Sequence, residues 1–243
     1  MQTDMTVGKP MKMLLNFTIP VFLGNVFQQL YSMADAVIVG KFVGTKGLAA
    51  VGATGTITFL IIGFLMGVTT GVTVLTSQKF GAGRMDEMRK TVGNAAILSA
   101  VIAVVMTAVS MLGMHRLLVF MHTPEDIFDG AYGYIMIICA GIFTQVLYNL
   151  VSSILRALGN SKTPLYFLIL AAGLNIVLDL VFIIFFHWGA PGAAWATVIS
   201  QGVSGVLCLI YMWKAVPELK MKKEDWCFNR DIAVKQISVG IPM

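Results

Sequence analysis

Charged side chains are almost absent from four long stretches of this chain of 243 residues. No Asp, Glu, Lys or Arg lies between Lys46 and Lys79, between Lys90 and Arg116, or between Asp129 and Arg156, and only Asp179 lies between Lys162 and Lys214. An α-helix needs about 20 apolar residues to cross a bilayer, where it satisfies its own backbone hydrogen bonds. The first three stretches therefore predict one transmembrane helix each, and the fourth is long enough for two.

The composition also indicates a membrane protein, because only 12% of the residues are charged, about half the share in a soluble domain. A further apolar segment, residues 14–39, is too long for the core of a signal peptide. We predict an all-α membrane protein, a bundle of six transmembrane helices at residues 14–39, 48–78, 91–114, 130–156, 163–187 and 190–213. Thr123–Asp126 predicts a helix start with acids in its first turn, and Gly189–Gly192 a break between the last two spans.

Basic residues are distributed unevenly between the two sides that six spans define. Lys41, Lys46 and Arg116 fall on one side, and the other 14 of the 17 Lys and Arg residues fall on the opposite side. Loops rich in Lys and Arg stay in the cytoplasm. We therefore expect a multi-pass protein of the cell (inner) membrane with both chain ends cytoplasmic. The net charge of +5 needs no nucleic-acid partner to explain it.

The end of the chain repeats a feature of its beginning. Ile19-Pro20 and Ile241-Pro242 each close an apolar segment that follows a basic, polar one. We expect a seventh helix to start here, which divides the chain into a six-helix N-lobe (1–213), a cytoplasmic loop between lobes (214–232) and the start of a seventh helix (233–243). On this hypothesis the chain is a fragment, and its partner is a missing C-terminal lobe in parallel orientation.

Two acids, Asp35 and Asp179, lie within the predicted spans. A carboxylate at the bilayer centre costs about 3 kcal/mol on insertion scales, so such residues face the bundle interior and mark functional sites by default. Two plainer interpretations stay open. Asp35 is near a span end and would then reach the membrane interface, and Asp179 would serve only as a buried hydrogen-bonding group.

Polar side chains accompany both acids at helical spacing. Gln28 shares a helix face with Asp35, and Asn175 lies one turn before Asp179. The remaining members of this set are Tyr134 and Asn149 on the fourth span and Thr197 and Gln201 on the sixth. Each one alone fits an interhelical hydrogen bond equally well. Together with the two carboxylates they supply hard oxygen ligands, which suit a proton or a small cation such as sodium.

Motifs for other chemistries are not found. Cys139, Cys208 and Cys227 form no C-x-x-C pair, and His115, His122 and His187 have no metal-ligand spacing. We find no P-loop, nucleophile motif or Ser-His-Asp arrangement, so we expect no catalytic residue, no enzyme activity and no cofactor. Active transport would then have to use an ion gradient or another subunit.

Several segments resemble one family of transporters when they are taken in order. They are Gln29-Leu30-Tyr31 with Ala34-Asp35, Leu48-Ala49-Ala50-Val51-Gly52, Thr76 to Gly83 (TSQKFGAG), Leu155 to Pro164 (LRALGNSKTP) and Gly192 to Thr197 (GAAWAT). Each segment is a weak signal alone. The ordered set covers nearly the whole chain and resembles the multidrug and toxic compound extrusion (MATE) transporters. Acids on both the first and the fifth span look like the DinF-type branch.

This resemblance implies a twelve-helix antiporter of two six-helix lobes, which exports cationic or amphipathic drugs and toxic compounds in exchange for protons or sodium. It places the proton or sodium site of the N-lobe on Asp35, Asn175, Asp179 and Thr197, with Gln28, Tyr134, Asn149 and Gln201 in the supporting network. Coupling would follow if a carboxylate removed from water takes up a cation and the bound cation favours one access state.

Two alternative functions stay open. A flippase for lipid-linked precursors, from the related superfamily, should line its cavity with Arg or Lys that bind a diphosphate, whereas the charges within these spans are acids. The other alternative is a non-transporting fragment. An efflux assay that depends on an ion gradient would separate these hypotheses.

Overall fold

A computed structural model describes residues 10–226 and 228–240 of the chain. Lys9, Cys227 and the Ile241-Pro242 pair, which contribute to the sequence predictions, lie outside these residues. The helices are α1 (Pro10–Phe42), α2 (Thr45–Gly81), α3 (Met85–Phe120), α4 (Glu125–Ala140), α5 (Ile142–Ala157), α6 (Lys162–Leu180), the π-helix η1 (Val181–Phe185), α7 (Gly189–Ala215), the short 3-10 helices η2 (Pro217–Leu219) and η3 (Lys223–Asp225), and α8 (Arg230–Gly240). The described residues contain no β-strand.

Five helical segments are long and apolar enough to cross a membrane, and these are α1, α2, α3, α6 with η1, and α7. The pair α4 and α5 makes a sixth span if the two helices cross together. The predicted all-α membrane fold is confirmed. Several helices extend beyond their predicted spans, as α3 does, which begins at Met85 and ends at Phe120, whereas the fifth span ends at Phe185, before its predicted bound at residue 187.

The predicted fourth span over 130–156 is built from two helices, α4 and α5, which are bent by 45° at the break between Ala140 and Ile142. Gly141 causes the bend, because its backbone lies so close to Val198 of α7 that a β-carbon there would overlap the valine side chain. Hydroxyl groups bind carbonyls at the break, where the Thr144 hydroxyl donates to the Gly141 carbonyl over 2.8 Å. A break in the helical hydrogen bonds at glycine is a common origin of sharp kinks.

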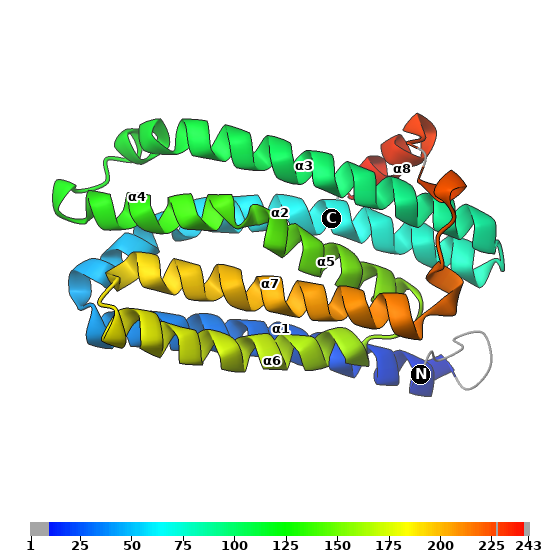
Figure 1. Ribbon diagram of the computed structural model, residues 1–243, viewed down its shortest axis with the longest axis horizontal. Helices are drawn as coiled ribbons and strands as arrows, with labels where there is room; N and C mark the ends of the chain where they lie inside the picture. Colours follow the sequence, from blue (N-terminus) through cyan, green and yellow to red (C-terminus); the bar gives the residue numbers. More distant parts are fainter. Residues whose placement is uncertain (1–9, 227, 241–243) are drawn as a thin grey trace.

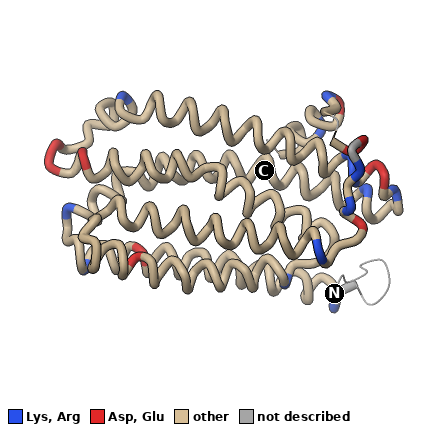
Figure 2. The backbone as a smooth tube through the Cα atoms, in the orientation of Figure 1, with Lys and Arg blue, Asp and Glu red and all other residues tan. Residues whose placement is uncertain are grey.

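Figure 1 shows a long bundle in which α1 and α6 lie side by side on one side and α3 lies on the other. Helix α7 contacts α4, α5 and α6, and α2 contacts α3, α4, α5 and α8. Figure 2 shows that Lys and Arg gather mainly at the end of the bundle that holds the α2–α3 loop and the segment between α7 and α8. The helices between the two ends are almost free of charge, as a bilayer requires.

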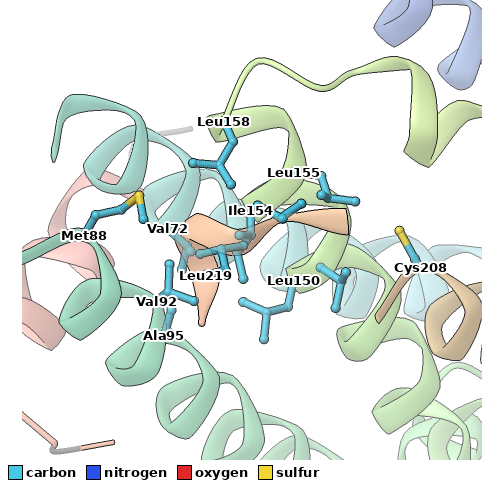
Figure 3. Packing of buried hydrophobic residues seen from close by; sticks show 12 residues of the cluster. Val72, Met88, Val92, Ala95, Leu150, Ile154, Leu155, Leu158, Cys208 and Leu219 are labelled. Atoms are coloured by element: carbon cyan, nitrogen blue, oxygen red, sulfur yellow. The ribbon is translucent and has the colours of Figure 1, made fainter. Parts of the chain in front are cut away.

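The interior is packed by several clusters of apolar side chains. One cluster joins α2, α3, α5, α7 and the following segment, and its members Val72, Met88, Leu155, Cys208 and Leu219 are shown in Figure 3. On the outside, large apolar side chains point away from the bundle, as Leu112 does with 84% of its surface exposed. This distribution fits lipid rather than water around the helices.

Local sequence signals mark several helix ends, among them the predicted start at Thr123–Asp126 and the predicted break at Gly189–Gly192. Glu125 and Asp126 form the first turn of α4, next to the positive end of the helix dipole. Gly159 has a φ of 79°, the left-handed conformation that closes α5, and the Asn160 side chain accepts a hydrogen bond of 3.1 Å from the Thr163 backbone N–H at the start of α6. Helix α7 begins at Gly189, within the predicted break.

Helix α8 packs along α2 and α3 rather than continuing away from the bundle. The backbone of Gly71 on α2 approaches α8 so closely that a β-carbon would overlap the Gln236 carbonyl oxygen. The segment predicted as a loop over 214–232 contains the last residues of α7, the two 3-10 helices and the first residues of α8.

Candidate cation site between α1, α6 and α7

Asp35 on α1 and Asp179 on α6 are both buried, with 7% and 0% of their surfaces exposed. Helices α1 and α6 pack against each other, and both acids lie in the C-terminal parts of their helices. The two carboxyl groups are close enough to share a hydrogen bond when one of them is protonated. Neither acid points into lipid, so the interpretation of Asp35 as an interfacial residue does not fit its burial.

Most of the oxygens of the two carboxylates lack a hydrogen-bond donor in the part of the chain that the structure describes. Both Asp179 oxygens and Oδ1 of Asp35 are buried without a hydrogen-bond partner among the residues that the structure describes. A buried carboxylate without a donor is costly, and two adjacent negative charges also repel each other. The pair therefore needs a proton or a cation from outside the protein.

Asn175 links this acid pair to α7. Its Nδ2 group donates a hydrogen bond of 3.4 Å to the Thr197 hydroxyl. Its carbonyl oxygen Oδ1 is buried and has no partner within the described part of the chain. Because Asn175 precedes Asp179 by one helical turn, an amide oxygen and two carboxylates lie in the same part of the bundle.

Two tyrosines and a glutamine surround the acids. The Tyr31 hydroxyl of α1 interacts with the side chain of Gln201 on α7 and lies within range of the charges of Asp35 and Asp179. Tyr134, from α4, approaches the same two acids and Tyr31. Side chains from α1, α4, α6 and α7 thus meet at one place inside the bundle.

An internal cavity of about 200 Å³ adjoins this cluster. Its polar lining includes Tyr31, Asp35, Tyr134 and Thr197, and apolar residues of α2 such as Ile61 form the facing wall. Neither Asp179 nor Asn175 belongs to the described lining, which places them behind Asp35 and Thr197. A cation that enters the cavity would meet Asp35 first.

Two of the residues proposed for the supporting network, Gln28 and Asn149, do not line the cavity beside Asp35. Gln28 is half-buried on α1, and in the described residues its side chain makes no hydrogen bond. Asn149 lies on α5 with its Nδ2 group buried and without a partner among the described residues, and it does not line the cavity. The part of these two residues in the supporting network stays a prediction.

Tyr31 is the member of the cluster that the sequence reasoning did not include in the site. Its signal was present, because Tyr31 lies four residues before Asp35 and hence on the same face of α1. Among the histidines, His115 forms edge contacts with the rings of Phe128 and Tyr132. No group of three or more His, Cys, Asp or Glu side chains that could hold a metal ion occurs in the described residues.

A bundle of membrane-spanning helices with acids buried in its interior defines a multi-pass membrane protein of the kind in which such acids mark ion or substrate pathways. The MatE family model matches residues 20–181, and the chain belongs to this family, the MATE transporters. It is 33% identical over 99% of its length to a probable multidrug resistance protein, YpnP, of Bacillus subtilis (strain 168), of which it covers 54%. It is 28% identical over 95% of its length to a probable multidrug resistance protein, NorM, of Thermotoga maritima, of which it covers 50%.

Solved structures agree with this assignment. The chain resembles a structure described as the outward-facing conformation of a multidrug resistance MATE family transporter, with a TM-score of 0.90 and 28% identity over 97% of this chain and 52% of that one. A MOP superfamily transporter from Pyrococcus furiosus matches with the same TM-score of 0.90 and 28% identity, over 97% of this chain and 52% of that one. The chain thus spans about half the length of the curated relatives and solved structures that it matches, and the predicted resemblance to one half of a MATE transporter is confirmed.

Proposed function

We propose that this chain forms the N-terminal lobe of an antiporter that exports cationic or amphipathic compounds in exchange for protons or sodium. The family is one of transporters, and relatives of about twice this length carry names that describe multidrug resistance. A second six-helix lobe would provide the other wall of the substrate pathway. The substrates and the partner lobe belong to this proposal.

The unneutralised acid pair is the observation that carries the proposal. Asp35 and Asp179 lie within hydrogen-bond reach of each other, and three of their oxygens have no donor among the described residues. One proton between the two carboxyl groups, or one sodium ion, removes the uncompensated charge. The amide oxygen of Asn175 and the hydroxyl of Thr197 are further oxygen ligands at this place.

Coupling follows from a difference in affinity between conformations. A cation that binds the acid pair more tightly in one access state shifts the population toward that state, and only by that difference. Asp35 faces the cavity, so its charge is the one that an incoming cationic substrate would sense. Neutralisation of the pair by the coupling cation would weaken the attraction for the substrate and promote its release.

The charge of the cavity argues against the flippase alternative. In the described residues, no Lys or Arg lines the cavity, and its ionisable side chains are Asp35 and two tyrosines. A diphosphate headgroup needs positive charge or several N–H donors. A cationic or neutral substrate fits this lining better.

We also propose that both ends of the six-helix bundle, the start of α1 and the end of α7, face the cytoplasm. The basic residues gather at the end that holds the start of α1 and the end of α7, as Figures 1 and 2 show. Only Lys41, Lys46 and Arg116 belong to the opposite loops. By the positive-inside rule, the end of the bundle with the excess of Lys and Arg lies in the cytoplasm.

Carbodiimide labelling tests the cation site on this chain itself. A hydrophobic fluorescent carbodiimide reacts with protonated carboxyl groups in apolar surroundings, so labelling of the purified chain should decrease as the pH rises. If sodium is the coupling ion, added sodium should protect the site, whereas potassium should not. The double variant Asp35→Asn/Asp179→Asn should lose the label, and the control Asp129→Asn, at an exposed residue of α4, should keep it. Labelling that survives the double variant would refute the site.

A further inference from the structure

A groove of about 580 Å³ lies on the outside of the bundle, apart from the cavity beside the acids. Helices α3 and α7 form its two walls, and α5, which packs on both of them, forms its floor. Figure 1 shows α5 turning from the direction of α4 toward α7. The 45° bend before Ile142 therefore creates the space between α3 and α7.

The lining of this groove is almost entirely apolar. It includes Ala96 and Ala100 of α3, Leu147 and Leu150 of α5, and Leu209 and Trp213 of α7. Several lining residues are open to the surroundings, since 76% of the Trp213 surface and 43% of the Ile210 surface are exposed. In a membrane, an open apolar groove along a bundle of helices is filled by hydrocarbon chains.

The segment between α7 and α8 closes one end of the groove and brings positive charge to it. Leu219, Met221 and Trp226 of this segment are part of the lining. Three lining residues are each followed directly by an exposed lysine, in the pairs Trp213-Lys214, Leu219-Lys220 and Met221-Lys222. Tryptophan and lysine at this position are typical of the membrane interface, where phospholipid headgroups lie.

These lysines are available to an external anion. No ion pair in the described part of the chain includes Lys214, Lys220 or Lys222. Asp86 of α3 is bound mainly by Arg89 and is only weakly attracted by Lys222, and Arg89 also approaches Asp225. The excess of positive charge at the mouth of an apolar groove matches a molecule with a hydrocarbon chain and a negatively charged headgroup.

We infer that the groove binds an anionic phospholipid of the leaflet at the basic end of the bundle. An acyl chain lies along α3, α5 and α7, and the headgroup phosphate lies over Lys214, Lys220 and Lys222. The bound lipid holds the segment between α7 and α8 against the bundle. This inference does not depend on the acid pair or on transport activity.

Lipid binding to the purified chain tests the headgroup. Native mass spectrometry in detergent, with phosphatidylglycerol or phosphatidylcholine added, should show phosphatidylglycerol adducts at a concentration at least tenfold lower. The triple variant Lys214→Gln/Lys220→Gln/Lys222→Gln should lose this preference, by about fivefold for each lysine removed. The matched triple Lys41→Gln/Lys46→Gln/Arg116→Gln removes the same charge from the opposite end and should keep it. Equal binding of the two lipids by the wild type would overturn the inference.

A second pair of variants tests the groove itself. Ala100→Phe fills the groove, whereas Val104→Phe adds the same ring one turn away on the exposed face of α3, outside the lining. The reporters are Trp213 and Trp226, which line the groove, in a background where Trp188 and Trp195 are replaced by Phe. In nanodiscs of phosphatidylcholine, a small fraction of brominated phosphatidylglycerol should quench their fluorescence. Ala100→Phe should abolish this quenching and Val104→Phe should preserve it. If quenching persists in Ala100→Phe, the lipid is attracted only by surface charge and does not enter the groove. If the chain forms a dimer that covers the groove, the occupant is a second copy of the chain. Either result would overturn the inference.

Discussion

Asn94 on α3 donates a hydrogen bond of 3.2 Å from its side-chain amide to Oε1 of Gln236 on α8, and both side chains are completely buried. Nε2 of Gln236 in turn donates to the Thr91 carbonyl over 3.0 Å, and the backbone N–H of Asn229 donates to Oδ1 of Asn94 over 2.9 Å. In both side-chain amides, the nitrogen and the oxygen are thus each hydrogen-bonded. This network fixes α8 on the bundle.

Replacement of both amides should destabilise the protein less than the sum of the two single replacements. Gln236→Leu leaves the Asn94 amide buried without its acceptor, which costs about 1–3 kcal/mol. The double variant Asn94→Leu/Gln236→Leu should lose less than the sum of the two single variants, because the two side chains interact. Reversible unfolding by SDS in mixed micelles measures the four free energies. Strictly additive losses would show that the two amides act independently.

A methyl group at Gly71 should displace α8. In Gly71→Ala the new β-carbon overlaps the Gln236 backbone carbonyl, so tryptic cleavage between Lys220 and Arg230 should become faster and the melting temperature should fall. Gly63→Ala is the matched control on the same helix, since its β-carbon would meet no atom within 4 Å. Alanine favours the helix by up to about 1 kcal/mol over glycine, so Gly63→Ala should be neutral or stabilising. Equal behaviour of both variants would contradict the close contact.

Single cysteines should reveal the orientation of the bundle. In a background without Cys139, Cys208 and Cys227, Lys46→Cys should react with an impermeant maleimide added to intact cells, and Lys222→Cys should react only after the cells are opened. The expected difference follows from the excess of basic residues on the side of Lys222. The reverse pattern would mean that the chain is inserted with the opposite orientation.

Neutral replacements of the two buried acids should abolish ion-coupled export. In a transporter that contains this lobe and a second one, Asp35→Asn and Asp179→Asn should each reduce efflux of a cationic dye such as ethidium to that of cells without the protein. An amide keeps the shape of the side chain but neither titrates nor attracts a cation. Expression level and detergent stability must match the wild type, and Asp129→Asn is the control. Full export by both variants would exclude the carboxylates as the coupling groups.

Removal of the Thr197 hydroxyl should weaken cation binding without preventing it. Thr197→Val deprives the Asn175 amide of its acceptor, and the freed N–H group then competes with the cation for the Asp179 carboxylate one turn away. A single net hydrogen bond contributes about 0.5–1.5 kcal/mol, so the proton or sodium concentration that half-saturates the site should rise by roughly two- to tenfold. Carbodiimide labelling measures this concentration. Thr197→Ser retains a hydroxyl and should bind the cation as the wild type does. If the serine variant binds the cation as weakly as the valine variant, the Thr197 hydroxyl has no part in cation binding.

The class of fold and the two acids within the spans could be predicted from the amino-acid sequence. Long uncharged runs must become helices in a bilayer, because each backbone amide there has to be bonded within its own segment. The positions of Asp35 and Asp179 within these runs followed directly from reading them, as did the helix starts at Glu125 and Gly189. These features depend on composition and on neighbours along the chain, which are visible in one dimension.

Which helix faces meet became clear from the packed bundle, not from the sequence. Lipid and protein interior are equally apolar, so no hydrophobic periodicity marks the buried side of a membrane helix. For this reason Tyr31 was left out of the predicted site although it shares a face with Asp35, and the meeting of α1, α4, α6 and α7 around the acids could not be read from the sequence. The bend at Gly141, and the outer groove that it creates, depend on the contact of a glycine backbone with Val198 of α7. That contact joins residues far apart in the chain, and it exists only once the helices have packed.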